Sequence, residues 1–369
     1  MTTKLQPTDI YAYLSQKVLG QEEVLKQVSV SVYKHIMGVK WGNILLIGNS
    51  GTGKTTIMNA VLEFYLDHQE LAEYQTMLVM NANTLTDESG EVHIHRIFKN
   101  LEADVRNRLG SGVSPQDLKT HIENATVCLD EIDKISAKIS DRVNVAGILI
   151  QQALLTILEG ETFYLETTIS REEKKLPVRI PINTARMLFI CGGAFEGLYD
   201  QVSYLVNSGK DGRVLKETYI YDKATKNLTR SADFILKKYM RINDLFDYGM
   251  VPQFISRFGA IEILENLGKD SLKEILMNAV DSPFVNAKIY FKTFGIDLEI
   301  SEEALELIAG QAEKNTRIGA RSLRESFNRI VSDFQFDPFG SDQVRQKGEK
   351  QVLVLEKDML EPYTKISGK

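Results

Sequence analysis

Cysteine is scarce in this sequence, with Cys128 and Cys191 as the two representatives among 369 residues. Two thiols cannot build a four-cysteine zinc site, and no cysteine–histidine cluster has the spacing of metal ligands. Each cysteine lies inside an apolar run that predicts a buried strand. We therefore expect both to be reduced thiols of the core, as in a reducing compartment such as the cytoplasm.

Long apolar runs are missing as well. The chain contains no stretch of about 18 apolar residues, which is the length that suggests a membrane-spanning helix. Residues 1–9 are polar and lack the hydrophobic segment that a secretory signal requires. These absences predict no membrane partner and a cytoplasmic location.

Basic residues are not in excess. The 44 lysines and arginines are outnumbered by 50 acidic residues, and the formal net charge is −6. Such a chain has no general electrostatic attraction for nucleic acid or for anionic lipid, so we expect neither as a partner. With 43% hydrophobic residues, the chain is long enough to bury a large core, and its length favours two or three domains.

Short apolar strands alternate with helical patterns along the first two thirds of the chain. Strands are predicted at 43–47, 77–80, 126–129 and 187–190, and residues 8–36 predict two helices broken near Gly20. This alternation predicts an α/β fold, in which helices cover both faces of a parallel sheet.

Two segments interrupt the alternation, and the character of the chain changes after them. Residues 162–186 predict a projecting hairpin or loop, and 199–245 predict a polar insertion. From 266 onward the pattern is mostly helical, with a late strand at 352–355. We predict a large domain over 1–265 that carries both insertions, and a smaller, mostly helical α+β domain over 266–369.

A phosphate-binding pattern follows the first strand. The pattern G-x-x-x-x-G-K-[ST], the Walker A or P-loop motif, is matched by Gly48-Asn49-Ser50-Gly51-Thr52-Gly53-Lys54-Thr55, with Thr56 next in the helix. Its glycines let backbone N–H groups turn inward around phosphates, and the following helix N-terminus favours negative charge. Lys54 suits the β- and γ-phosphates, and the Thr55 hydroxyl suits Mg²⁺. The pattern predicts ATP and Mg²⁺ as cofactors.

A second motif ends the strand at 126–129. Its residues, Val127-Cys128-Leu129-Asp130-Glu131, resemble a Walker B element. Asp130 is predicted to hold Mg²⁺, and Glu131 is the candidate base that polarises the attacking water. Alone the pattern is weak, but a P-loop upstream makes it strong. Adjacent carboxylates favour an ATPase over a small GTPase, which positions water with glutamine.

Blocks in the same order along the chain resemble the AAA+ module of the ClpX family, the unfoldase subunits of a bacterial protease, and of its relative HslU. The blocks extend from about residue 10 to about residue 330, and they are Val18–Gln21, Val32–His35, Thr84–Thr86, Leu129–Ile135, Gln151–Gly160, Leu188–Phe195, Val251–Arg257 and Gly319–Arg324.

The resemblance implies several roles. Val18 and Leu19 would lie beside the adenine. Arg257 would be the arginine finger that reaches a neighbouring subunit's nucleotide, and Arg321 would be the sensor-2 residue that reaches the phosphates. A guanidinium suits both roles because it is always charged and donates to several phosphate oxygens. The resemblance also implies a hexameric ring that engages a protein substrate at its pore or insertions.

The sequence departs from the family at three places. The family begins with a four-cysteine zinc domain, which two cysteines cannot supply. The family's first pore loop carries an aromatic residue, whereas the corresponding Asp87-Glu88-Ser89-Gly90-Glu91 is acidic, which favours a basic or polar partner. The family's peptidase-docking tripeptide, Ile/Leu-Gly-Phe, is absent from 199–245.

Three interpretations remain open at this point. The chain could be a ring ATPase that remodels or assembles a protein partner without the ClpP peptidase, which the departures favour. It could be a ClpX-type unfoldase that grips its substrate through other residues. It could also be a nucleotide-gated oligomeric scaffold, although the intact Glu131, Arg257 and Arg321 argue against a scaffold without hydrolysis.

Overall fold

The computed structural model describes residues 5–40, 42–87, 89–139, 142–171, 174–216, 218–222, 227–231, 234–279, 281–314, 319–340, 343–348 and 350–364. The chain divides into two compact units. The first is built mainly from residues before Asn266, and the second mainly from Asn266 onward. Ser15–Glu22 and Asn49–Lys54 group with the second unit.

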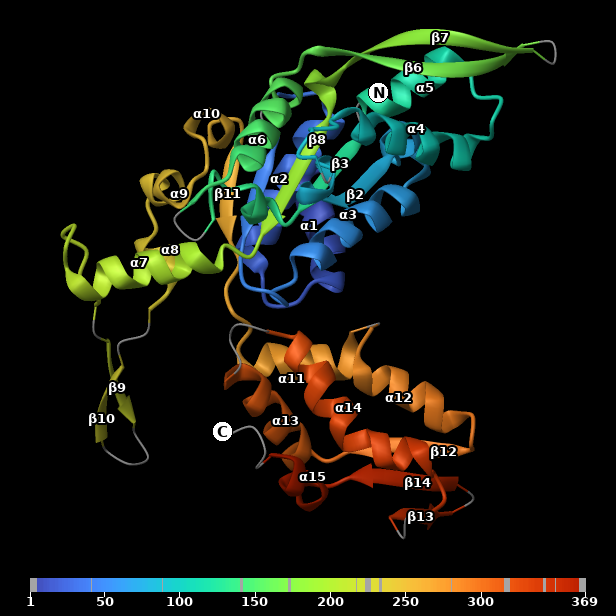
Figure 1. The fold of residues 1–369 in the computed structure, drawn as a ribbon. Coiled ribbons are helices and arrows are strands. Elements are labelled where there is room, and N and C mark those ends of the chain that lie inside the picture. Colours follow the sequence, from blue (N-terminus) through green and yellow to red (C-terminus); the bar gives the residue numbers. More distant parts are fainter. Residues whose placement is uncertain are drawn as a thin grey trace. The chain divides into compact units, whose positions relative to one another are not determined.

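A parallel sheet forms the centre of the first unit, with its strands in the order β11-β1-β8-β3-β2 (Figure 1). The strands are β1 (Ile44–Ile47), β2 (Met77–Asn81), β3 (Thr126–Asp130), β8 (Leu188–Gly193) and β11 (Ala260–Ile263). Every residue of β1 and β8 is buried, as expected for central strands that helices cover on both faces. The α/β fold and the four predicted strands are confirmed. The edge strand β11 was not predicted.

Helices of the first unit precede β1 and fill the connections between these strands. They are α1 (Pro7–Lys17), α2 (Glu22–Ile36), α3 (Lys54–Asp67), α4 (His95–Leu109), α5 (Pro115–Glu123), α6 (Val145–Leu158) and α10 (Pro252–Ile255). Short 3₁₀ turns are η1 (Gln69–Tyr74), η2 (Ala82–Leu85), η3 (Ile132–Ile135) and η4 (Thr184–Arg186), and β4 (Lys138–Ile139) pairs with β5 (Arg142–Val143). The two helices predicted within 8–36 are confirmed. No helix in the described ranges is long and apolar enough to cross a membrane.

A long antiparallel hairpin, β6 (Thr162–Arg171) with β7 (Lys174–Asn183), occupies the segment predicted as a projecting hairpin or loop (Figure 1). Its base packs on α4. The ring of Phe163 stacks on buried Phe98 with centroids 4.1 Å apart. Arg106 donates to the Thr167 hydroxyl at 3.0 Å and, from Nε, to buried Glu102 at 2.9 Å. These contacts fix the first half of the hairpin on α4.

The segment 199–245 contributes to the core, although its polar sequence predicts an insertion. It contains most of α7 (Glu196–Ser208), together with α8 (Leu236–Tyr239) and α9 (Ile242–Tyr248). Leu198, Val202 and Val206 of α7 are buried in the main hydrophobic cluster of the first unit. Between α7 and α8 the chain extends into a smaller hairpin, β9 (Thr218–Asp222) with β10 (Asn227–Ser231) (Figure 1). The protruding part is therefore shorter than the predicted insertion.

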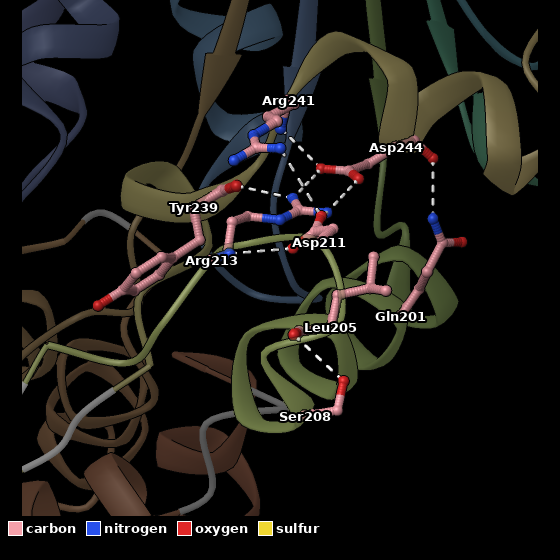
Figure 2. A network of polar contacts seen from close by, with 8 residues as sticks. All are labelled: Gln201, Leu205, Ser208, Asp211, Arg213, Tyr239, Arg241 and Asp244. Atoms are coloured by element: carbon pink, nitrogen blue, oxygen red, sulfur yellow. Dashed lines mark hydrogen bonds and ion pairs between the residues drawn. The ribbon is translucent and has the colours of Figure 1, made fainter.

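A buried ion pair ties together the two chain segments that lead into and out of the β9–β10 hairpin. Figure 2 shows the Arg213 guanidinium between Asp211 and Asp244. It donates to the two Asp244 oxygens at 2.6 and 2.9 Å and to the Tyr239 carbonyl at 2.9 Å. Asp244 also accepts from the backbone N–H of Arg241 at 2.6 Å. Arg213 and Asp244 are only 7% and 3% exposed, so each charge depends on the other.

Arg213→Met is expected to lower the free energy of unfolding of the first unit by about 3–5 kcal/mol, because it leaves the buried Asp244 carboxylate without its cationic partner. Urea unfolding, with hydrogen exchange followed over residues 211–248, measures the loss. Lys210→Met is the matched control, since Lys210 is exposed and its ammonium contacts the hydroxyl and ring of the exposed Tyr204. Equal stability of the two variants would contradict the role of the ion pair.

The second unit is a helical domain with a small sheet. Its helices are α11 (Lys269–Asn278), α12 (Pro283–Lys292), α13 (Glu302–Lys314), α14 (Arg321–Phe336) and α15 (Lys357–Thr364). The sheet has the order β12-β14-β13, formed by β12 (Ile296–Ile300), β14 (Lys350–Leu355) and β13 (Val344–Lys347). The predicted late strand is confirmed as β14, whereas β12 and β13 were not predicted. Phe284, Phe291 and Phe327 are buried in its own core.

Both cysteines are free thiols buried in central strands, as the sequence predicts. Burial raises the pKa of the Cys128 thiol and of the Cys191 thiol above the ordinary value. A thiol is nucleophilic only as the thiolate, so neither group is suited to chemistry.

Candidate active site

The carboxyl end of β3 and the start of α3 bring a hydroxyl and a carboxylate together in the first unit. The Thr55 hydroxyl donates to Asp130 Oδ2 at 3.1 Å. Asp130 Oδ1 accepts from the backbone N–H of Glu131 at 2.8 Å, which fixes the carboxylate plane. A hydroxyl and a carboxylate are hard oxygen ligands of the kind that Mg²⁺ prefers. The structure thus brings together the two residues that the sequence assigned to the metal.

Glu131 has a left-handed backbone, with a φ of +55°. A residue other than glycine rarely adopts this conformation, and where it does the surrounding structure enforces it, often at a functional site. The turn directs the chain from β3 into η3, and the side chain stays within reach of Asn83, whose amide lies 3.5 Å from the Glu131 carboxylate. This amide can orient a carboxylate that acts as a base.

The loop between β1 and α3 turns twice through glycines with positive φ, +77° at Gly51 and +103° at Gly53. Lys54 is 8% exposed, and its ammonium donates to the Asn49 carbonyl at 3.0 Å. Thr52 is buried, and its carbonyl accepts from the side chain of Gln21 at 3.0 Å. The sequence assigned no role to Gln21, which braces the loop.

The remaining residues that the sequence assigned to the nucleotide lie in this loop, beside it, or at the start of α3. Gly48 is buried and its N–H donates to the Gly193 carbonyl of β8 at 3.2 Å. Val18 is buried, and one of its methyl carbons lies 3.8 Å from the position that a Cβ atom at Gly53 would occupy. Leu19 and Ser50 are half-buried, whereas Thr56 is exposed on α3.

Arg321 is the first residue of α14 and is exposed. Within the second unit, the preceding Ala320 donates its N–H to the Gly51 carbonyl at 3.2 Å. Gly319 is required there, because a side chain would begin 2.9 Å from the carbonyls of Ser50 and Gly51. The loop and the start of α14 are thus adjacent, as the assignment of Arg321 to the phosphates requires.

Arg257 lies at the opposite end of the sheet from Thr55 and Asp130. Its carbonyl accepts from Asn43, the residue just before β1, at 3.3 Å. Asn43 also accepts from Phe189 of β8 at 3.0 Å, so Arg257 belongs to the amino ends of the strands. Its guanidinium pairs with Glu159 and borders a cavity of about 290 Å³. The four residues of β1 alone span ~13 Å at ~3.3 Å each, so Arg257 does not join Thr55 in one subunit.

Comparisons with known proteins agree with this architecture. The family described as AAA domain (Cdc48 subfamily) matches residues 39–261. A Borrelia duttonii protein named ATP-dependent Clp protease ATP-binding subunit ClpX is 30% identical, over 96% of this chain and 78% of its own. The chain belongs to the ClpX-like AAA+ ATPases. Proteins of the same name from Porphyromonas gingivalis and Treponema denticola are 25% and 28% identical, over 98% and 95% of this chain and 83% and 80% of theirs.

Membership identifies this ClpX-like protein as an ATP-hydrolysing enzyme.

Asp133, to which the sequence assigned no role, connects two strands that end at the site. Asp133 is 5% exposed, and its Oδ1 accepts from the N–H of Ala194 at 3.2 Å. A side chain at Gly193 would begin 2.7 Å from the same oxygen. Asp133 therefore joins the exit of β3 to the exit of β8, the two strands that end at the site.

The acidic loop Asp87–Glu91, which the resemblance aligns with the family's first pore loop, contains a set of hydrogen bonds to Asp87. Asp87 Oδ1 accepts from the N–H groups of Ser89 and Glu91 at 2.9 and 3.0 Å, and Oδ2 lies 2.7 Å from His93 Nε2. The His93 imidazole and the Ser89 hydroxyl hold the pKa of the Asp87 carboxyl below its usual range. Asp87 thus organises the loop, whereas the sequence suggested that it faces a partner. Glu91 is exposed, and Glu88 lies outside the described residues.

Proposed function

We propose that this ATPase uses ATP hydrolysis to remodel or assemble a protein partner, as a hexameric ring and without the ClpP peptidase. ATP would bind at the loop Gly48–Thr55, with Val18 and Leu19 assigned to the base and Arg321 to the phosphates. Thr55 and Asp130 would hold Mg²⁺, and Glu131 would polarise the attacking water. The 3.1 Å contact between Thr55 and Asp130 supports the metal assignment.

The positions of Arg257 and Thr55 at opposite ends of β1 are the observation that supports a ring. Arg257 lies at the amino end of β1, and Thr55 follows the carboxyl end of the same strand. An arginine finger placed there completes a nucleotide site only on another copy of the chain. Copies that repeat one such head-to-tail contact form a ring when the rotation between neighbours closes. A domain of residues 1–265 and a smaller one of residues 266–369 then contribute Glu131 and Arg321, respectively.

Independence from the peptidase rests on two features of this chain. The relatives are, by name, ATP-binding subunits of a Clp protease. In this chain the region 199–245 has no Ile/Leu-Gly-Phe tripeptide, and part of it is occupied by the core helix α7. The loop at Asp87–Glu91 has no aromatic side chain with which to grip an unrelated polypeptide.

A second candidate function, a ClpX-type unfoldase that grips through other residues, is favoured by an apolar surface on β4, β5 and the first turns of α6. Ile139, Val143, Val145 and Leu149 are 54%, 73%, 62% and 44% exposed. Apolar side chains that are this exposed and this close in sequence are a typical contact surface for polypeptide.

A degradation assay separates the two candidates. With ATP, ClpP and an unfolded tagged protein, we expect no loss of the tagged protein above the control without ATPase, because the docking tripeptide is missing. ATP-dependent degradation would establish the unfoldase instead. A basic peptide that stimulates ATP turnover would support the remodelling function. Glu91→Gln should weaken that stimulation, and a Tyr204→Ser control, at an exposed position of α7, should leave it unchanged.

A further inference from the structure

Gln151 of α6 is fully buried, and its side-chain amide makes three hydrogen bonds to backbone groups of other chain segments. Its Nε2 donates to the carbonyl of Ile135, at the end of η3, at 2.7 Å and to that of Gly249 at 3.3 Å. Its Oε1 accepts from the N–H of Val251 at 2.7 Å. A buried amide that satisfies this many backbone groups fixes their relative positions.

The segments joined by Gln151 are packed too closely to move independently. A side chain at Gly249 would begin 2.4 Å from the Ser136 hydroxyl, and the Gly249 carbonyl accepts from the N–H of Ala137 at 2.8 Å. The Ser136 hydroxyl donates to the Tyr248 carbonyl at 2.8 Å. A side chain at Gly147 of α6 would begin 2.6 Å from the Ile135 carbonyl.

The two joined segments lead to the two ends of the reaction. Ile135 ends the turn that begins immediately after Glu131, the candidate base. Val251 is the N-cap of α10, and Arg257 follows the end of that helix by two residues. Gln151 is therefore a direct side-chain link between the exit of the Walker B strand and the segment that carries Arg257.

We propose that Gln151 is a positioning residue for Arg257. It sets the start of α10 against the segment that leaves the nucleotide site, so that the finger offered to a neighbouring subunit follows the state of the subunit's own site. This inference rests on the proposed assignment of Arg257 as the arginine finger.

Two variants test the link. Gln151→Met has a similar length and makes none of the three hydrogen bonds. Val251→Pro removes the N–H that donates to Gln151, and proline suits this position because the φ is −67° and the ψ of 127° suits a residue before Pro252. Gln152→Met is the matched control, since the neighbouring Gln152 is exposed.

Both variants are expected to bind ATP with unchanged affinity and to lose turnover, on the order of a hundredfold for Gln151→Met, because a displacement of about 1 Å at a catalytic group has an effect of this size. Gln152→Met should match the wild type. Should Gln151→Met not fold, Val251→Pro decides, and wild-type turnover in Val251→Pro would overturn the inference.

Mixed rings separate positioning of the finger from general damage. A subunit with a misplaced finger keeps its own site, so mixing Gln151→Met with Glu131→Gln should restore hydrolysis, whereas mixing it with Arg257→Ala should not. Restoration by Arg257→Ala would place the defect in the variant's own site, and failure with both partners would indicate general damage; either result overturns the inference. Full turnover of Arg257→Ala alone would instead refute the proposed role of the finger.

Discussion

Glu131→Gln is expected to lower the rate of ATP hydrolysis by about 10²–10⁴-fold, the range that a general base contributes, and to leave ATP binding intact. Glutamine keeps the size of the side chain and can still contact Asn83, but it cannot accept the proton of the attacking water. The Glu131 side chain makes no capping hydrogen bond to η3, so the left-handed turn should persist in the glutamine variant.

Lys54→Ala is the contrasting variant, because it should abolish binding itself. A polyphosphate in the loop would lose its main cationic partner. Binding of a fluorescent ATP analogue and steady-state phosphate release measure the two effects separately. Tight binding by Lys54→Ala, or near-normal turnover by Glu131→Gln, would mean that the nucleotide site has been assigned to the wrong residues.

The sequence predicts the centre of the fold well because its signals there are local. Strands such as Ile44–Ile47 are continuous apolar runs. A glycine-rich turn follows β1, and acidic residues stand at the end of β3. The edge strand β11 has a charged residue, Glu262, within it, and therefore gave a weaker pattern. The strand β13 is mostly exposed and has Val344 as its apolar residue, so it too gave a weak strand pattern.

What the sequence could not predict depends on contacts between distant residues. Gln151 meets Val251 across 100 positions, and Asp133 meets Ala194 across 61. The residue types of Gln151 and Asp133 do not by themselves indicate these contacts. The buried pair of Arg213 and Asp244 is equally silent, since each residue by itself resembles an ordinary surface charge. The polar character of 199–245 thus concealed the core helix α7.

Arg257→Ala is expected to bind ATP normally and to hydrolyse it at least about 10³-fold more slowly, the range found for arginine fingers in related phosphoryl-transfer enzymes. In the structure the guanidinium is paired with Glu159 and is remote from its own subunit's Thr55. Loss of the side chain should therefore not disturb the nucleotide site of the same chain. Isothermal titration with ATP and a coupled turnover assay measure the two properties.

Mixing Arg257→Ala subunits with Glu131→Gln subunits tests whether the site is shared. Each variant alone lacks one component at every interface. In a ring mixed at random in equal amounts, about a quarter of the head-to-tail interfaces pair an intact base with an intact finger. Hydrolysis should therefore recover to a measurable fraction of the wild-type rate, with a maximum near equal proportions. Energy transfer between differently labelled Arg257→Ala and Glu131→Gln subunits serves as the control for subunit exchange. If the labelled subunits exchange, the mixture is as inactive as its two components, and the wild type hydrolyses ATP at full rate as a monomer, then Arg257 does not act on a neighbouring subunit.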